Sequence, residues 1–211
     1  MGNISHIATL RGVVQSSDYR LTYTLHDVFE SPLNFLDTAA SYGDGESERR
    51  IGEVLKEIGG LPEDSMLATK ADRDLQTGDF SGEQMRRSVE RSLRRLGLDH
   101  FQLVYLHDPE YLNDPGREPF EYMMAPGGPM EVLMRFKDEG IIENLEIAGG
   151  PIDLIIRFVE TDLFEAIITH NRYTLCERDF QMSDRRKVLH DPLKVALPIL
   201  CVLQAGDYGL R

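Results

Sequence analysis

The stretch SGEQMRRSVERSLRRLGLDHFQLVYLH, residues 81–107, decides the fold class. Its first part has the period of a helix, because its apolar residues fall on one face while most of its arginines lie elsewhere. This apolar stripe consists of Met85, Val89, Leu93 and Leu96. Ser81 with Gln84 predicts a capping box at the start of the helix. Residues 102–107 then form an almost continuous apolar run, typical of a strand buried on both faces of a parallel sheet.

The same alternation extends in both directions along the chain. Short apolar runs predict further strands at 34–38, 66–70, 145–148 and 166–169. Segments with helical period predict helices at 21–29 after a candidate cap at Ser17, at 51–58 ending at Gly59-Gly60, at about 130–138 and at 152–161. This repetition predicts an α/β fold with a parallel sheet, either a closed barrel or an open doubly wound sheet. No G-x-G-x-x-G pattern follows the first of these strands, which disfavours a dinucleotide-binding Rossmann sheet.

Composition restricts the classes of partner and compartment. The chain has 211 residues, which suits one domain over 1–211, and a formal net charge of -13. That charge disfavours nucleic acid and an anionic membrane surface as partners. Two cysteines, Cys176 and Cys201, fit a reducing compartment, and residues 1–12 lack the apolar run of a secretory signal. The apolar stretch 195–203 is too short to span a bilayer, so we expect a cytoplasmic protein.

Polar side chains stand at the ends of three successive predicted strands. The first strand ends near Asp37, with Tyr42 five residues further on, the second ends in Lys70 and the third in His107. In a parallel barrel these ends face one mouth, so we expect the four side chains to converge. The long segment 108–129, rich in proline and glycine, follows the third strand on the same side and is predicted to be a loop that could act as a lid.

This combination of side chains suits proton transfer coupled to hydride transfer. A tyrosine hydroxyl ordinarily titrates near a pH of about 10, and a neighbouring ammonium lowers that pKa. Lys70 would supply the charge, Asp37 would hold Lys70, and His107 would orient the substrate oxygen while Tyr42 relays the proton. Each residue also has a simpler interpretation: a solvated lysine, an aspartate that caps the following segment, a packed tyrosine and a histidine that anchors a loop.

Three stretches resemble the aldo-keto reductase family. The first is N-F-L-D-T-A-A-S-Y-G (34–43), the second is A-T-K (68–70), and the third is S-V-E-R-S-L-R-R-L-G-L-D-H-F-Q-L-V-Y-L-H (88–107). The first stretch is followed by further matching residues, Glu46, Glu48 and the pair Ile51-Gly52. The resemblance implies a (β/α)8 TIM barrel and a small sugar or aldehyde as substrate, with NADP or NAD as cofactor.

The resemblance extends over residues 17–179 and also implies roles for single residues. The positions that match the family's catalytic set are Asp37, Tyr42, Lys70 and His107. The stretches I-A-G-G-P-I-D-L (147–154) and T-H-N-R-Y-T-L (169–175) are similar to the aldose dehydrogenase branch, whose members oxidise sugars such as L-fucose, D-threo-aldoses or galactose. By that likeness His170 and Asn171 would bind the cofactor near its nicotinamide amide, and Asp37 would also face the cofactor.

The sequence departs from the family pattern in three places. Residues 1–12 lack a clear glycine-rich run, Glu146 stands where the family usually has glycine, and residues 180–211 contain none of the recognised phosphate-binding motifs. A complete barrel of this kind needs about 250 residues. We therefore expect a barrel that is incomplete or closed unusually, with 184–189 helical and 196–203 a strand. Open edges of such a sheet favour pairing into a homo-oligomer.

Three functions remain open at this point. The first is an NAD(P)-dependent aldose or aldehyde oxidoreductase, and the second is a non-catalytic binding protein on the same scaffold that lacks a complete cofactor site. A metal-dependent barrel hydrolase using His107, Asp108, Glu110 and His170 is the third, although no H-x-H or H-E-x-x-H pattern supports it. No metal is therefore expected.

Overall fold

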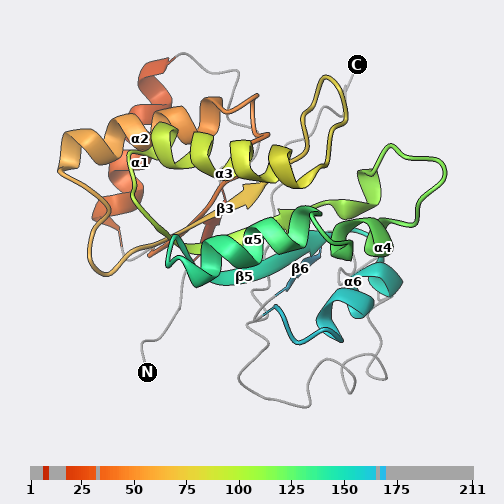
Figure 1. Ribbon diagram of the computed structural model, residues 1–211. Coiled ribbons are helices and arrows are strands. Elements are labelled where there is room, and N and C mark those ends of the chain that lie inside the picture. Colours follow the sequence, from red (N-terminus) through yellow and green to blue (C-terminus); the bar gives the residue numbers. More distant parts are fainter. Residues whose placement is uncertain (1–6, 10–17, 32–33, 165–166, 170–211) are drawn as a thin grey trace, which may run out of the picture.

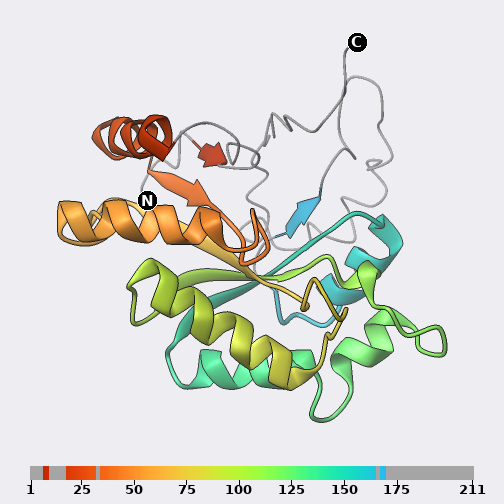
Figure 2. The ribbon, with the colours of Figure 1, turned by 90° about the horizontal axis from the view of Figure 1, so that it is seen from above.

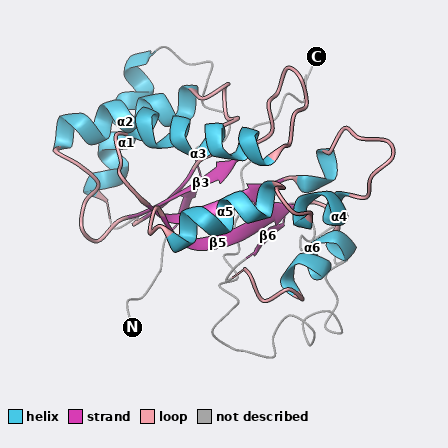
Figure 3. Ribbon diagram, viewed as in Figure 1, coloured by secondary structure: helices cyan, strands magenta, loops and turns pink. Residues whose placement is uncertain are grey.

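The computed structural model describes residues 7–9, 18–31, 34–164 and 167–169. Its strands are β1 (Ile7–Thr9), β2 (Phe35–Asp37), β3 (Met66–Ala71), β4 (Phe101–His107), β5 (Ile142–Gly149) and β6 (Ile167–Thr169). Its helices are α1 (Asp18–Glu30), α2 (Glu46–Ile58), α3 (Gly82–Leu96), α4 (Pro119–Met124), α5 (Pro129–Asp138) and α6 (Ile152–Val159), with a short 3-10 helix, η1 (Pro109–Tyr111). Helices and strands alternate along most of this length (Figures 1 and 3).

The sheet has the winding of a barrel. Its six described strands are all parallel and lie in sequence order, β1-β2-β3-β4-β5-β6. A doubly wound sheet reverses its strand order at a switch point, whereas a (β/α) barrel adds each strand beside the previous one. Figure 2 shows α1, α2, α3 and α5 following one another along the outer side of the curved sheet. The predicted TIM-barrel class is confirmed, as an incomplete barrel of six strands over the described residues.

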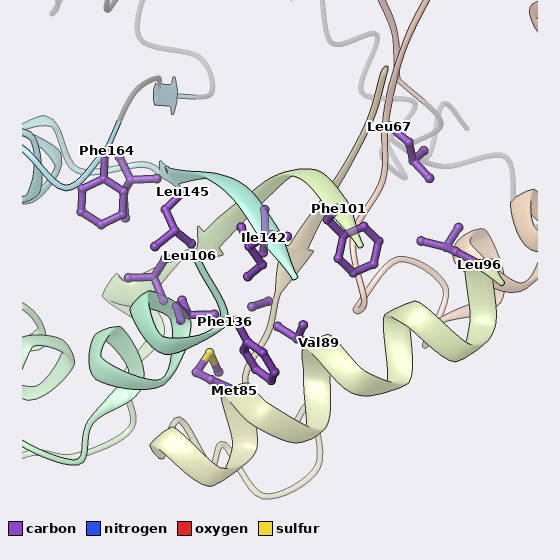
Figure 4. Close-up of a cluster of buried hydrophobic side chains, with 14 of the residues drawn as sticks. Leu67, Met85, Val89, Leu96, Phe101, Leu106, Phe136, Ile142, Leu145 and Phe164 are labelled. Atoms are coloured by element: carbon purple, nitrogen blue, oxygen red, sulfur yellow. The ribbon is translucent and has the colours of Figure 1, made fainter. Parts of the chain in front are cut away.

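The larger apolar core lies between the sheet and its helices. Strand residues that point outward, such as Leu67, Leu106 and Leu145, pack against the buried stripe of α3 and against Phe136 of α5 (Figure 4). That stripe has the composition that the helical period predicts, since Met85, Val89 and Leu96 are buried and Leu93 is partly buried. Each fully buried side chain of this size contributes about 1.5–3 kcal/mol through removal from water, so this layer holds the helices against the strands.

The opposite face of the sheet points into the barrel. A second, smaller apolar cluster lies there, formed by Phe35, Ala68, Leu103, Tyr105 and Ala148. These residues alternate along their strands with the outward-pointing set, as the pleat of a strand requires. Because Asp37, Lys70 and His107 follow two residues after members of this cluster, they have the same inward direction at the C-terminal ends of their strands.

Most predicted elements are present with small shifts in their ends, and the predicted stop at Gly59 is a left-handed C-cap with φ 90°.

The capping box predicted at the start of α3 is confirmed only in its first half. The Ser81 hydroxyl accepts a hydrogen bond from the Gln84 N–H at 3.2 Å, but the Gln84 amide donates to the Asp72 carbonyl at 3.0 Å instead of returning to Ser81. Helix α3 is thereby tied to the end of β3.

Three elements were not predicted from the sequence. Residues 7–9 form β1 beside β2, although the segment 1–12 has no extended apolar run. The segment 108–129, predicted to be a loop, contains η1 and α4. Its prolines do not prevent helix formation, because Pro109 and Pro119 occupy first turns, where the missing N–H costs nothing.

Several sequence predictions fall outside the described residues: His170, Asn171, both cysteines and the elements expected at 184–189 and 196–203. Among the helices that are described, none combines the length and the apolar character needed to cross a bilayer.

The close contact between α2 and α3 at Gly52 predicts that a larger residue there destabilises the fold. A Cβ at this position would lie 1.9 Å from the Arg95 carbonyl oxygen of α3. In an ordinary helix interior, alanine is more favourable than glycine by about 1 kcal/mol. We expect Gly52→Ala to lower the free energy of unfolding by about 1–3 kcal/mol instead, through overpacking, as measured by urea denaturation. Lys56→Ala, at an exposed position of α2, is the control and should change little. A stabilised Gly52→Ala variant would contradict this contact.

Candidate active site

A buried ion pair joins the ends of β2 and β3. The Lys70 ammonium donates to the Asp37 carboxylate at 2.6 Å and to the Thr38 carbonyl at 2.7 Å. Lys70 and Asp37 are 2% and 1% exposed, so Lys70 is not a solvated lysine. Burial alone would lower the pKa of Lys70, but the negative charges of Asp37 and of an ionised Tyr42, with hydrogen bonds to both, outweigh it and raise the pKa. Lys70 therefore carries a stable positive charge inside the barrel.

Tyr42 and His107 complete the cluster beside this pair. The Lys70 ammonium lies 4.7 Å from the centroid of the Tyr42 ring. The rings of Tyr42 and His107 meet edge to face, with centroids 6.0 Å apart and an interplanar angle of 74°. Three strand ends and one loop thus bring together the four side chains that the sequence singled out.

The loop that carries Tyr42 is held from behind by α3. The Arg95 guanidinium donates to the Ala40 carbonyl at 3.3 Å and to the Asp44 carbonyl at 3.2 Å, on either side of Tyr42. Only glycine fits at position 45, because φ is +88° and a Cβ there would lie 1.9 Å from the Arg95 side chain. The loop conformation is therefore determined by a contact with a residue far away in the sequence.

Glu48, which follows this loop in α2, balances the charge of Arg95. Its side chain is fully buried and accepts hydrogen bonds from Thr69 at 2.7 Å and from Arg95 at 3.3 Å. Burial raises the pKa of Glu48, an effect that the hydrogen bonds from Thr69 and Arg95 oppose only in part. Glu48 thus links the Tyr42 loop to the outer face of β3.

Asp72 is a site residue that the sequence analysis missed. It follows β3 directly and is 1% exposed. Its Oδ1 atom lies 2.5 Å from Nδ1 of His107. Its Oδ2 atom accepts the Ser41 N–H at 2.9 Å. Burial alone would raise the pKa of Asp72, but the charge of His107 and hydrogen bonds from His107 and Ser41 lower it. The spacing of two residues from Lys70, on the same side of a strand, is the signal that would have identified it.

A second tyrosine lies near the same ammonium. The Tyr105 ring centroid is 5.6 Å from Lys70 Nζ, and the side chain is 3% exposed. Burial, followed by the negative charges of Asp37, Glu146 and Tyr42, raises the pKa of Tyr105 well above its usual value. Glu146, the residue that departs from the family pattern, is itself buried and reinforces this effect. The Tyr105 hydroxyl therefore stays protonated. The Tyr42 ring differs in lying closer to the Lys70 ammonium.

One buried acceptor of the site has no hydrogen-bond donor among the described residues, namely the Oδ1 atom of Asp37. A buried carboxylate oxygen without a donor is unfavourable, so this atom suits a hydroxyl of a bound molecule. The described residues include no group of three or more His, Cys, Asp or Glu side chains suited to a metal ion. His107, Asp108 and Glu110 do not form such a group, and His170 lies outside the described part of the chain.

The ion pair makes a stability prediction. Asp37→Asn leaves the Lys70 ammonium buried without its counter-ion, and we expect the free energy of unfolding to fall by about 3–5 kcal/mol. Adding Lys70→Met should recover much of that loss, because the uncompensated charge is removed. Chemical denaturation of the two single variants and the double variant measures this coupling. Additive losses in the double variant would contradict a direct interaction.

Comparisons with known proteins agree with this geometry. The sequence model of the Aldo/keto reductase family matches residues 9–198. A D-threo-aldose 1-dehydrogenase from Pseudomonas sp is 29% identical over 187 residues, covering 77% of this chain and 54% of that enzyme. An L-galactose dehydrogenase from Arabidopsis thaliana is 38% identical over 88 residues, covering 42% of this chain and 28% of that enzyme.

Solved structures lead to the same family. An aldo-keto reductase from Bacillus halodurans, determined in its holo form, superimposes with a TM-score of 0.57 at 28% identity, over 72% of this chain and 49% of that one. The chain thus spans about half the length, or less, of these three relatives. The matched region includes the strands and loop that carry the site. The chain belongs to the aldo/keto reductase family and is similar to its aldose dehydrogenase branch.

Proposed function

We propose that this protein is an NAD(P)-dependent oxidoreductase that oxidises an aldose at its anomeric carbon, or reduces a small aldehyde in the reverse direction. The observation that carries the proposal is the buried Lys70 ammonium, which is held by Asp37 and lies 4.7 Å from the Tyr42 ring. Membership of the aldo/keto reductase family supports this class of reaction.

Tyr42 performs the proton transfer in this proposal. The charge of Lys70 stabilises the phenolate form of a nearby tyrosine, so that Tyr42 can accept the proton of the anomeric hydroxyl during oxidation and return it during reduction. Asp37 keeps the ammonium in place through its 2.6 Å contact. Arg95 limits movement of the loop through its bonds on both sides of Tyr42.

His107 orients the oxygen that loses or gains the proton. Its ring lies edge to face with Tyr42, so a sugar oxygen between the two side chains would contact both. A bound nicotinamide ring supplies the acceptor for the hydride that leaves the anomeric carbon. The Oδ1 atom of Asp37, buried and without a donor among the described residues, fits a hydroxyl of that cofactor. On the family likeness, His170 and Asn171 would bind its amide.

The aldose preference rests on the relatives. Proteins named D-threo-aldose 1-dehydrogenase and L-galactose dehydrogenase are among the matches. A hemiacetal hydroxyl beside a carbon that bears hydrogen satisfies the requirements of this site, because one group gives up a proton and the adjacent carbon a hydride.

Tyr42→Phe tests the proton relay against a matched control. We expect aldose-dependent reduction of NAD or NADP, followed by absorbance over a panel of aldoses, to fall by at least about 100-fold, since the general acid–base group is lost. Tyr105→Phe removes a hydroxyl close to the same ammonium, but one that stays protonated, and should retain activity. Equal activity of the wild type and Tyr42→Phe would refute the assignment.

Titration with each cofactor separates the proposal from a non-catalytic binding protein. We expect saturable binding of NAD or NADP, measured by calorimetry. Asp37→Asn removes the charge of the oxygen that we propose accepts a hydrogen bond from the cofactor. We expect this variant to bind the cofactor about 10-fold or more weakly, as for the loss of a hydrogen bond to a charged group. Thermal unfolding checks that this variant is folded at the temperature used. Absence of binding to the wild-type chain would favour the non-catalytic alternative.

A further inference from the structure

The Asp72 carboxylate makes contacts that the proposed reaction leaves unexplained. Its two oxygens bind two different parts of the site, Nδ1 of His107 at 2.5 Å and the Ser41 N–H at 2.9 Å. Ser41 precedes Tyr42 directly. One buried carboxylate therefore joins the imidazole to the loop that carries the tyrosine.

The position of Asp72 follows from the strand register. Lys70 pairs with Tyr105 and Ala71 with Leu106, so the next step along β3 and β4 places Asp72 beside His107. Side chains at paired positions of parallel strands point the same way, which directs both into the barrel.

Helix α3 holds the backbone of Asp72. Its N–H donates to the Ser88 hydroxyl at 3.0 Å, and its carbonyl accepts from the Gln84 amide at 3.0 Å. Ser88 and Gln84 are both buried. The carboxylate is thus held in position from its backbone as well as through its own contacts.

The contact with His107 determines which ring nitrogen carries hydrogen. An ionised carboxylate is only an acceptor, so the hydrogen of a neutral imidazole must lie on Nδ1, facing Asp72. Nε2 is left for the substrate. Among the described residues, a second carboxylate faces the ring, that of Asp108. Its Oδ2 lies 3.5 Å from Nε2, longer than an ordinary hydrogen bond.

We infer that Asp72 is a positioning residue, which fixes His107 in the Nδ1–H tautomer with Nε2 turned toward the substrate and couples that ring to the Tyr42 loop. The catalytic part of this inference rests on the proposed function. A neutral Nε2 can only accept a hydrogen bond. A hemiacetal hydroxyl has one hydrogen, which it donates to Nε2 on binding and turns to Tyr42 for the proton transfer. A carbonyl oxygen has no hydrogen to donate, so the arrangement suits a sugar hemiacetal that is about to be oxidised better than a carbonyl group. Asp72 itself touches neither substrate nor cofactor in this scheme.

Asp72→Asn should reverse the tautomer. An asparagine side chain has one oxygen acceptor and one NH2 donor, and the Ser41 N–H requires the oxygen. The NH2 group then faces His107, whose Nδ1 must accept, so its hydrogen moves to Nε2. We expect nitrogen NMR of the histidine side chains to report Nδ1–H in the wild type and Nε2–H in the variant. His107→Gln identifies the signal among the six histidines of the chain.

The control is Ser88→Ala, which removes the acceptor of the Asp72 N–H but leaves the carboxylate unchanged. If Asp72 only anchors its loop, the two variants should lose similar stability on thermal unfolding and both should keep the wild-type tautomer. In our inference only Asp72→Asn changes the tautomer and alters the pH profile of kcat. A loss in kcat of about 100-fold or more, with little change in cofactor affinity, is expected for an incorrect histidine tautomer.

The tautomer measurement needs neither substrate nor cofactor, so it stands apart from the proposed function. An Nε2–H signal in the wild type, or an unchanged Nδ1–H signal in Asp72→Asn, would overturn the inference even if the protein oxidises aldoses. A switched tautomer in a chain without activity would leave the positioning role intact and refute the proposed function.

Discussion

The arrangement of the site depends on one constraint, that the Lys70 ammonium is buried and requires a carboxylate. An isolated ammonium inside a protein is unfavourable by many kcal/mol, so the charge is tolerated only with a close partner. Asp37 is that partner because β2 and β3 are adjacent and parallel. The pair fixes the relation between the two strand ends and places positive charge beside Tyr42.

Helix α3 supports the site although none of its residues belongs to the proposed catalytic set. Arg95 near its C-terminus holds the backbone of the Tyr42 loop, while Gln84 and Ser88 in its N-terminal half hold the backbone of Asp72. The same helix packs its apolar stripe on the outer face of the sheet. Apolar packing therefore determines where the helix lies. Its hydrogen bonds in turn fix the position of the Tyr42 loop and of Asp72 at the mouth of the barrel.

The two tyrosines near Lys70 illustrate how environment separates residues of the same type. Tyr105 lies on a strand, deep among apolar neighbours and close to the carboxylates of Asp37 and Glu146, and it keeps its proton. Tyr42 lies on a loop, half-buried, where the ammonium is closer. The chemistry of the site thus depends on where the protein excludes water as much as on which side chains it contains.

The sequence by itself predicted most of the strands and helices, because hydrophobic periodicity is local. The convergence of the polar strand ends followed from expecting a parallel barrel. It also supplied the four residues that match the family pattern. The alternation alone could not separate a barrel from a doubly wound sheet, since the two differ in strand order. The family resemblance predicted the barrel, and the strand order of the structure confirms it. Only the tertiary structure revealed Asp72 and Arg95, because their partners Ser41, His107 and the Tyr42 loop are far away in the sequence and come into contact through strand register and helix packing.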